Sequence, residues 1–127
     1  MSNVDPRIMN AIDNQIVKGR IESKDLLVGD KVTVHTKHSI YYIYITEKGI
    51  KVNSTNDRYC GPYEGTLIGT TIAPGSSILC PQAFAVGGSL ELWVEKLDTK
   101  PGRIITSEVK TVSINGVQVL PLSEAVS

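Results

Sequence analysis

The stretch from Gly29 to Asn53 constrains the fold more than any other part of the chain, because it holds the densest run of β-branched and aromatic residues. Such residues favour strands, and their alternation here predicts two or three antiparallel strands. Val32 and Val34 alternate with polar neighbours. This alternation predicts a strand with one buried face and one face exposed to solvent.

The segment from 39 to 46 differs, because apolar side chains would occupy both of its faces. The two sets are Tyr41, Ile43 and Ile45 on one face, and Ile40, Tyr42 and Tyr44 on the other. Both faces of such a strand need to be covered by a second layer, a partner or a ligand. The segment is therefore either a central strand with tyrosine hydroxyls at the rim, or a strand whose second face, with Tyr42 and Tyr44, contacts a partner or ligand.

The 127 residues suffice for one domain with a hydrophobic core that needs neither disulfide nor metal. We expect a single β domain over residues 1–127, with its β body over residues 20–122. Before this body, an acid followed by proline, isoleucines four residues apart and Gly19 predict a short helix over residues 5–18. Its apolar stripe would pack on the β body or on a neighbouring subunit.

The rest of the chain is predicted to form short strands, over residues 20–22, 66–73, 77–80, 83–86, 89–95, 103–114 with an interruption, and 117–120. Turn residues separate them, and Asn115-Gly116 favours the positive φ angles of a type I′ turn. About eight strands with short connections predict a mainly β fold. We expect a small antiparallel β-barrel or β-sandwich with one short N-terminal helix.

Two places outside the tyrosine-rich strand carry residue types that are enriched where proteins contact partners. The segment 54–65 has no hydrophobic periodicity, which indicates a long loop, and it contains Arg58, Tyr59 and Tyr63. The alternation in residues 89–95 places Trp93 on the polar face of its strand, beside Glu91 and Glu95. Trp93 is therefore either a lid over a loop or a contact residue.

No pattern of residues indicates a catalytic or metal site. His35 and His38 lie three residues apart on a predicted strand, so they point to opposite faces, and neither forms a zinc-type pair with Cys60 or Cys80. The nucleophile elbow, the phosphate-binding glycine loops and a carboxylate pair at glycosidase spacing are also missing from the sequence. We expect free thiols, no cofactor, no metal and no enzymatic activity.

Charge and hydropathy limit the partners. Lys plus Arg and Asp plus Glu both number 13, and this balance disfavours non-specific nucleic-acid binding while permitting self-association. The first residues lack the pattern of a secretion signal, and no apolar run approaches the roughly 20 residues of a membrane span. We expect a cytoplasmic or virion protein that does not enter membranes.

Several short motifs lie in a recognisable order: Val28-Gly-Asp-Lys-Val, His38-Ser-Ile-Tyr, Gly69-Thr-Thr-Ile, Gly88-Ser-Leu-Glu-Leu and Thr106-Ser-Glu-Val. Over residues 28–112 this order resembles small uncharacterised all-β proteins of bacteria and their phages. The resemblance implies a β fold and carries no function with it.

These observations favour a non-enzymatic structural or interaction protein that self-associates or docks on a larger assembly, such as a phage particle. The alternative is a protein that binds or sequesters a small, nucleotide-like ligand in a pocket lined by Arg58, Tyr59, Tyr63 and Trp93. A hydrolase would need Cys60 or Cys80 beside one of the two histidines.

Overall fold

The computed structural model describes residues 20–56, 61–73, 75–97 and 100–121. The expected helix over residues 5–18 lies outside these ranges, and so do Arg58, Tyr59 and Cys60. The only helical element within them is one 3-10 turn.

The described residues form ten strands, where the sequence predicted about eight. In chain order the elements are β1 (Arg20–Glu22), η1 (Ser23–Asp25), β2 (Lys31–Thr36), β3 (Ile40–Ile45), β4 (Ile50–Ser54), β5 (Tyr63–Thr71), β6 (Leu79–Pro81), β7 (Ala83–Ala85), β8 (Ser89–Leu97), β9 (Lys100–Ile114) and β10 (Val117–Leu120).

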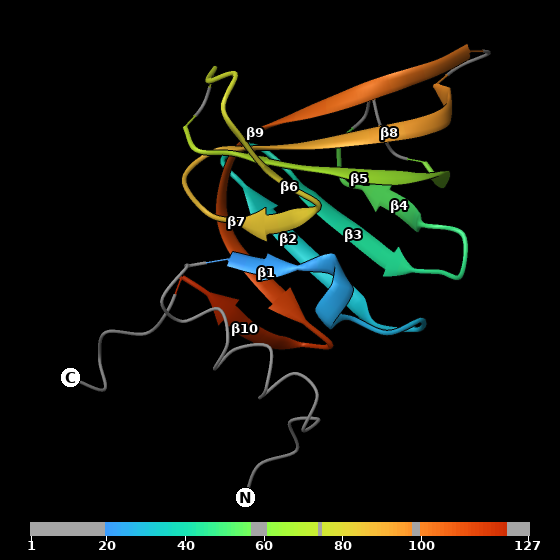
Figure 1. Cartoon of the computed structure of the whole chain (residues 1–127), viewed down its shortest axis with the longest axis horizontal. Helices are drawn as coiled ribbons and strands as arrows, with labels where there is room; N and C mark the ends of the chain where they lie inside the picture. The colour runs from blue at the N-terminus through green and yellow to red at the C-terminus, as the bar shows by residue number, and fades with distance from the viewer. Residues whose placement is uncertain (1–19, 57–60, 74, 98–99, 122–127) are drawn as a thin grey trace, which may run out of the picture.

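Six of these strands close into an antiparallel barrel in the order β2, β3, β4, β5, β8 and β9, with β9 returning to β2 (Figure 1). The sequence left barrel and sandwich open, and the barrel is the observed form. Outside the ring, β6 pairs with the end of β5, and β10 pairs with the end of β9.

The barrel interior is filled by the alternating apolar residues that the sequence predicted to be buried. Val32 and Val34 of β2 are fully buried, and so are Leu90, Leu92 and Val94 of β8. Burying one such side chain contributes about 1.5–3 kcal/mol relative to leaving it exposed. The period of two in these strands therefore sets which side of each strand faces inward.

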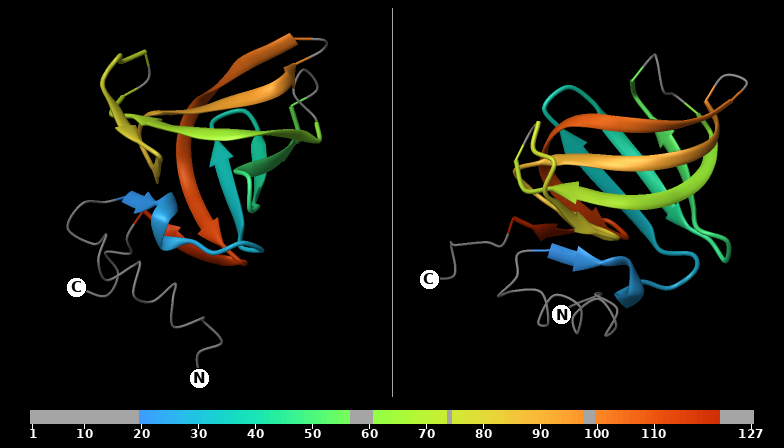
Figure 2. Two further views of the ribbon diagram at one scale, coloured as in Figure 1. Left: turned by 45° about the vertical axis from the view of Figure 1, so that its right-hand side comes forward. Right: turned by 45° about the horizontal axis from the view of Figure 1, so that its top comes forward.

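A small two-stranded sheet of β1 and β7 lies across one end of the barrel (Figures 1 and 2). Ile21 is opposite Phe84 in this sheet, and both side chains are buried within the same hydrophobic core as the barrel. The buried hydroxyl of Thr70 in β5 holds the sheet in place. It donates to the carbonyl oxygen of Ala83 at 2.9 Å and accepts from the N–H of Ala85 at 3.3 Å.

The doubly apolar strand β3 is covered differently on its two faces. Tyr41 and Ile43 point into the core and are almost fully buried, whereas Tyr42 and Tyr44 lie on the outer face. Among the described residues no second layer covers this face; the ammonium group of Lys31 lies 5.9 Å from the centre of the Tyr42 ring. Tyr44 is 36% exposed. Partial cover by neighbouring side chains therefore takes the place of the second layer that a sandwich would supply.

The start of β5 differs from the sequence prediction, and the turn between β9 and β10 agrees with it. β5 starts at Tyr63 rather than Thr66, because residues 63–65 pair with residues 50–52 of β4. This shortens the predicted loop over residues 54–65. The turn between β9 and β10 is confirmed, since Asn115 and Gly116 have φ angles of 50° and 88°.

The predicted interruption in residues 103–114 is a change of partner rather than a break. β9 remains extended from Lys100 to Ile114, but it pairs with β8 over residues 100–108 and with β2 over residues 109–114. Irregularities in both registers accompany this change. The first half of β9 is therefore bonded to a neighbouring strand on one side.

Candidate binding surface

The structure does not bring the predicted contact residues together in one place. Tyr42 and Tyr44 lie on the outer face of β3, and Trp93 lies on the outer face of β8, with β4 and β5 between these strands. Tyr63 is half-buried and packs against the core, so it faces the opposite side of the sheet from Trp93. Arg58 and Tyr59 lie outside the described residues.

Trp93 belongs to a surface, here called the outer patch, that consists of Glu91, Trp93, Arg103 and Ile105 on β8 and β9. Trp93 is opposite Arg103 and Glu91 is opposite Ile105. These two same-face pairs place the four side chains at the corners of a square. The Arg103 guanidinium and the Glu91 carboxylate form an ion pair at 3.4 Å along one diagonal of this square. The apolar residues occupy the other diagonal, with Trp93 43% exposed and Ile105 55% exposed.

The register of β8 and β9 explains why this patch forms on the outside. Leu92 and Ile104 are opposite each other, fully buried inside the barrel, so their sequence neighbours must point outward. Sequence reasoning found Trp93 but missed Ile105. The consecutive isoleucines at 104 and 105 were the only available indication, because they give β9 apolar side chains on both faces.

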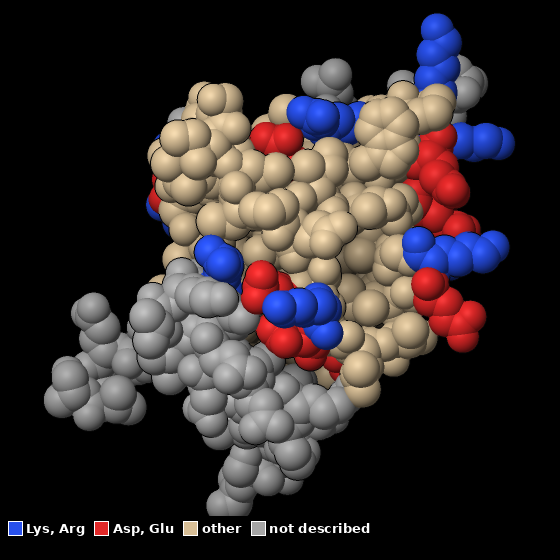
Figure 3. All heavy atoms as spheres, viewed as in Figure 1, with Lys and Arg blue, Asp and Glu red and all other residues tan. Residues whose placement is uncertain are grey.

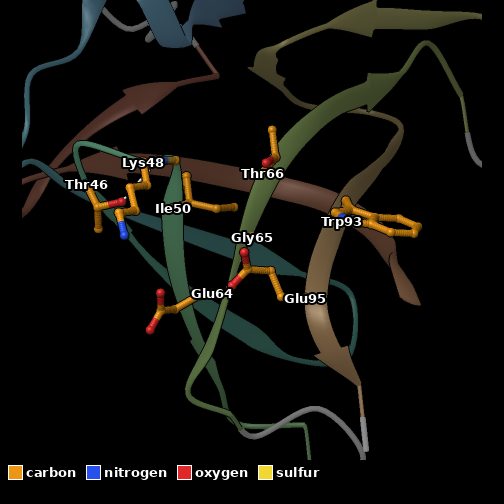
Figure 4. Close-up of a pocket in the computed structure, with 9 residues that line it drawn as sticks. Thr46, Lys48, Ile50, Glu64, Gly65, Thr66, Trp93 and Glu95 are labelled. Carbon is orange, nitrogen blue, oxygen red and sulfur yellow. Dashed lines mark hydrogen bonds between the residues drawn. The ribbon is translucent and has the colours of Figure 1, made fainter. Parts of the chain in front are cut away.

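A shallow groove lies next to the patch, where the β3–β4 turn separates from β5. It has a volume of about 190 Å³ and is lined by Thr46, Lys48, Gly49, Ile50, Glu64, Gly65, Thr66, Trp93 and Glu95. The groove exists because β4 pairs with β5 only as far as Gly65, after which β5 continues beside β8. Figure 4 shows that the indole of Trp93 points away from Lys48 and Glu64, at the margin of the groove.

The groove is smaller than the roughly 300–1,000 Å³ of pockets that enclose drug-sized ligands. Its charged groups are the carboxylates of Glu64 and Glu95 and the ammonium of Lys48. The balance of these charges is negative, which opposes an anionic, nucleotide-like ligand. The groove therefore favours a neutral or cationic group over a phosphate.

A second apolar surface is the hairpin between β5 and β6. Ile72 and Ile78 face each other across its turn, where the N–H of Ile72 donates to the carbonyl of Ile78, and they are 55% and 62% exposed. The sequence contains no charged residue between Glu64 and Glu91. In Figure 3 charged side chains gather along the right-hand margin and at the lower centre of the visible face, and the area between these two groups is largely uncharged.

Of the residues that the sequence suggested for chemistry, the three that the structure describes lie on different elements. Cys80 lies on β6, which pairs with β5, whereas His35 lies on β2 and His38 on the turn after it. Within residues 20–56, 61–73, 75–97 and 100–121, no group of three His, Cys, Asp or Glu side chains is placed to hold a metal ion. The same residues include no helix with the length and apolar character of a membrane span.

No family model, no curated protein and no solved structure matches the chain. The geometry of the outer patch and of the groove is therefore the basis for a functional proposal.

Proposed function

We propose that this barrel is a non-enzymatic interaction protein, which self-associates or docks on a larger assembly such as a phage particle. The observation that carries this proposal is the outer patch. Trp93 and Ile105 expose apolar surface on a rigid sheet. The ion pair of Arg103 with Glu91 neutralises the only charges of the patch.

Tryptophan and arginine in one place are typical of the residues that dominate binding energy at protein interfaces. A sheet holds them in fixed positions, so little conformational entropy is lost when a partner binds. The uncharged hairpin with Ile72 and Ile78 supports the proposal independently, because both isoleucines are more than half exposed among the described residues and offer apolar surface to a partner. The helix predicted over residues 5–18 would supply another apolar surface for docking.

Size-exclusion chromatography with light scattering at micromolar concentration tests the proposal. We expect a mass of at least two chains of 13.8 kDa each, or co-elution with a larger particle. Replacing both Trp93 and Ile105 by serine should shift the population toward the single chain. Leu27→Ser is a matched control, since Leu27 is 49% exposed but lies outside the patch. A wild-type monomer that joins no larger particle would contradict the proposal.

Binding of a small ligand at the groove is the second candidate. It is supported by the side chains of Thr46, Lys48 and Thr66, which offer polar anchors beside Trp93. Titration calorimetry with a nucleotide and with an organic cation of similar size distinguishes the ligand classes. Because two carboxylates oppose one ammonium, we expect the cation to bind more tightly, and Glu95→Gln should weaken that binding.

A further inference from the structure

We infer that the first half of β9 pairs with the same segment of a second copy of this chain, in antiparallel orientation, so that two barrels share one continuous sheet. This inference rests on the proposed self-association and specifies its surface. The segment concerned is residues 101–106, here called the β9 edge.

Within the described part of the chain, no strand occupies the β9 edge on the side away from β8. β2 begins to pair with β9 only at Val109, and the last backbone bond before that point runs from the N–H of Lys37 to the carbonyl oxygen of Glu108 at 2.8 Å. Among the described residues, no backbone group pairs with residues 101–106 on this side. In Figure 1 this half of β9 forms the upper margin of the sheet, beyond β8.

The close approach of β8 and β5 identifies which backbone groups of β9 point within the sheet to the open side, away from β8; these groups are called outward below. The carbonyl oxygen of Trp93 lies against the α-carbon of Gly65, so the backbone groups of Trp93 are directed at β5 and not at β9. In an antiparallel pair, opposite residues alternate between exchanging both hydrogen bonds and exchanging none. Trp93 is opposite Arg103, so the N–H and C=O of Arg103 point away from β8. Ile105, two residues further, has the same orientation.

Pro101 gives an independent check of this assignment. Proline has no N–H, and within a sheet it is confined to positions where its nitrogen does not face a neighbouring strand. Pro101 lies two residues before Arg103, so its nitrogen faces the same open side. The proline also limits pairing to the residues that follow it, because it offers no donor there.

A second copy fits this edge better than an arbitrary strand, because the edge is complementary to itself. When Arg103 of one copy is opposite Ile105 of the other, every outward N–H and C=O of these two residues meets a partner. The alternative register centred on Arg103 would place the two guanidinium groups side by side. The register centred on Ile105 would require Ser107, where the turn after β2 already lies, since its side-chain oxygen accepts from the N–H of His38.

The side chains beside the edge are compatible with this pairing. Arg103 forms an ion pair with Glu91 of its own chain, which offsets the repulsion that an edge arginine ordinarily causes. Ile105 of each copy would lie next to Arg103 of the other, and the two outer patches would form one surface. Because apolar area around Ile105 becomes covered, pairing also explains why an isoleucine is tolerated at a 55% exposed position.

A proline substitution at position 105 tests the inference. Ile105→Pro removes an outward N–H but leaves the bonds between β8 and β9 unchanged, so the barrel should remain folded. We expect sedimentation velocity to show a dimer dissociation constant raised by about tenfold or more. The control Ile105→Thr keeps the N–H and the β-branched shape, and should raise the constant less. Circular dichroism of both variants confirms that each remains folded.

Cross-linking tests the register in a background with Cys60 and Cys80 replaced by serine. An equimolar mixture of the Arg103→Cys and Ile105→Cys variants should form a disulfide-linked dimer, because opposite residues lie about 5.5 Å apart between α-carbons. Each variant alone should cross-link much more slowly. Equal cross-linking in all three samples would overturn the register.

The outcomes separate this inference from the proposed function. If the wild type self-associates and Ile105→Pro weakens it more than Ile105→Thr, the inference is supported. If the wild type self-associates and the proline has no larger effect, the β9 edge is not the interface although the proposed function stands. If the wild type is monomeric at all concentrations, the pairing is overturned, and only docking on a different partner remains of the proposed function.

Discussion

The carbonyl oxygen of Trp93 lies directly against the α-carbon of Gly65, so that a β-carbon at position 65 would overlap the backbone of β8. Gly65 is also the residue at which β5 pairs with both β4 and β8, opposite Ile50 and Val94. The absence of a side chain at this point therefore allows three strands to approach, which closes the barrel and leaves the groove beside it.

This contact predicts that Gly65 tolerates no side chain. Gly65→Asn should lower the free energy of unfolding by about 3 kcal/mol or more, because the atoms that must move belong to backbone rather than to a flexible side chain. Gly116→Asn is the matched control: Gly116 has a φ of 88° and open space around it, and asparagine adopts this conformation more readily than most residues. Chemical denaturation of both variants measures the difference, and equal losses would contradict the prediction.

Two neighbouring residues on β8 should lose very different amounts of stability when each is replaced by alanine. Leu92 is fully buried, so Leu92→Ala should lower the free energy of unfolding by about 2–5 kcal/mol through lost burial and a cavity. Trp93→Ala removes a larger side chain from the outer face, yet should cost less than about 1 kcal/mol. Because Trp93 is the only tryptophan, unfolding should be followed by circular dichroism. A larger loss for Trp93→Ala would show that its indole is structural.

The secondary structure was predictable wherever local chemistry alone decides it. The alternation in Val32 and Val34 indicated which side of β2 is buried, and Asn115-Gly116 indicated a turn with positive φ angles. Barrel closure was not predictable, because it depends on β9 leaving β8 and joining β2 partway along its length. This change involves residues that are distant in the sequence, and no local pattern encodes it.

The candidate surface was predictable only in part. The position of Trp93 between two glutamates indicated an outward side chain, which the structure confirms. Arg103 and Ile105 join Trp93 through the register of β8 and β9, which the sequence does not specify. Tyr63 was expected in a loop, but it begins β5 and packs against the core. An aromatic residue next to glycine and proline has no local feature that separates these two outcomes.

Asp30 should be important for stability because its carboxylate joins two distant parts of the chain. It is buried, it accepts from the N–H of Leu27 at 2.8 Å, and it accepts from the side-chain amide of Asn115 at 3.1 Å. Asp30→Ala leaves these donors without that acceptor, so it should lower the free energy of unfolding by about 1–3 kcal/mol. Asp30→Asn retains one acceptor oxygen and should cost less. Thermal and chemical denaturation measure both variants. If Asp30→Ala and Asp30→Asn lose equal stability, the carboxylate has no hydrogen-bonding role.

The sheet of β1 and β7 should depend on the hydroxyl of Thr70, which is fully buried and bonded to Ala83 and Ala85. Thr70→Val keeps the shape of the side chain but deprives the Ala83 carbonyl and the Ala85 N–H of this partner, at a cost of about 1–3 kcal/mol. Hydrogen exchange should locate the effect, with faster exchange at the Ala85 amide and little change in β2 or β3. Thr33→Val is the control, since Thr33 lies on the outer face of β2 and should change stability by less than about 0.5 kcal/mol. Unchanged exchange at Ala85 would mean that burial of Phe84 alone holds this end of the barrel closed.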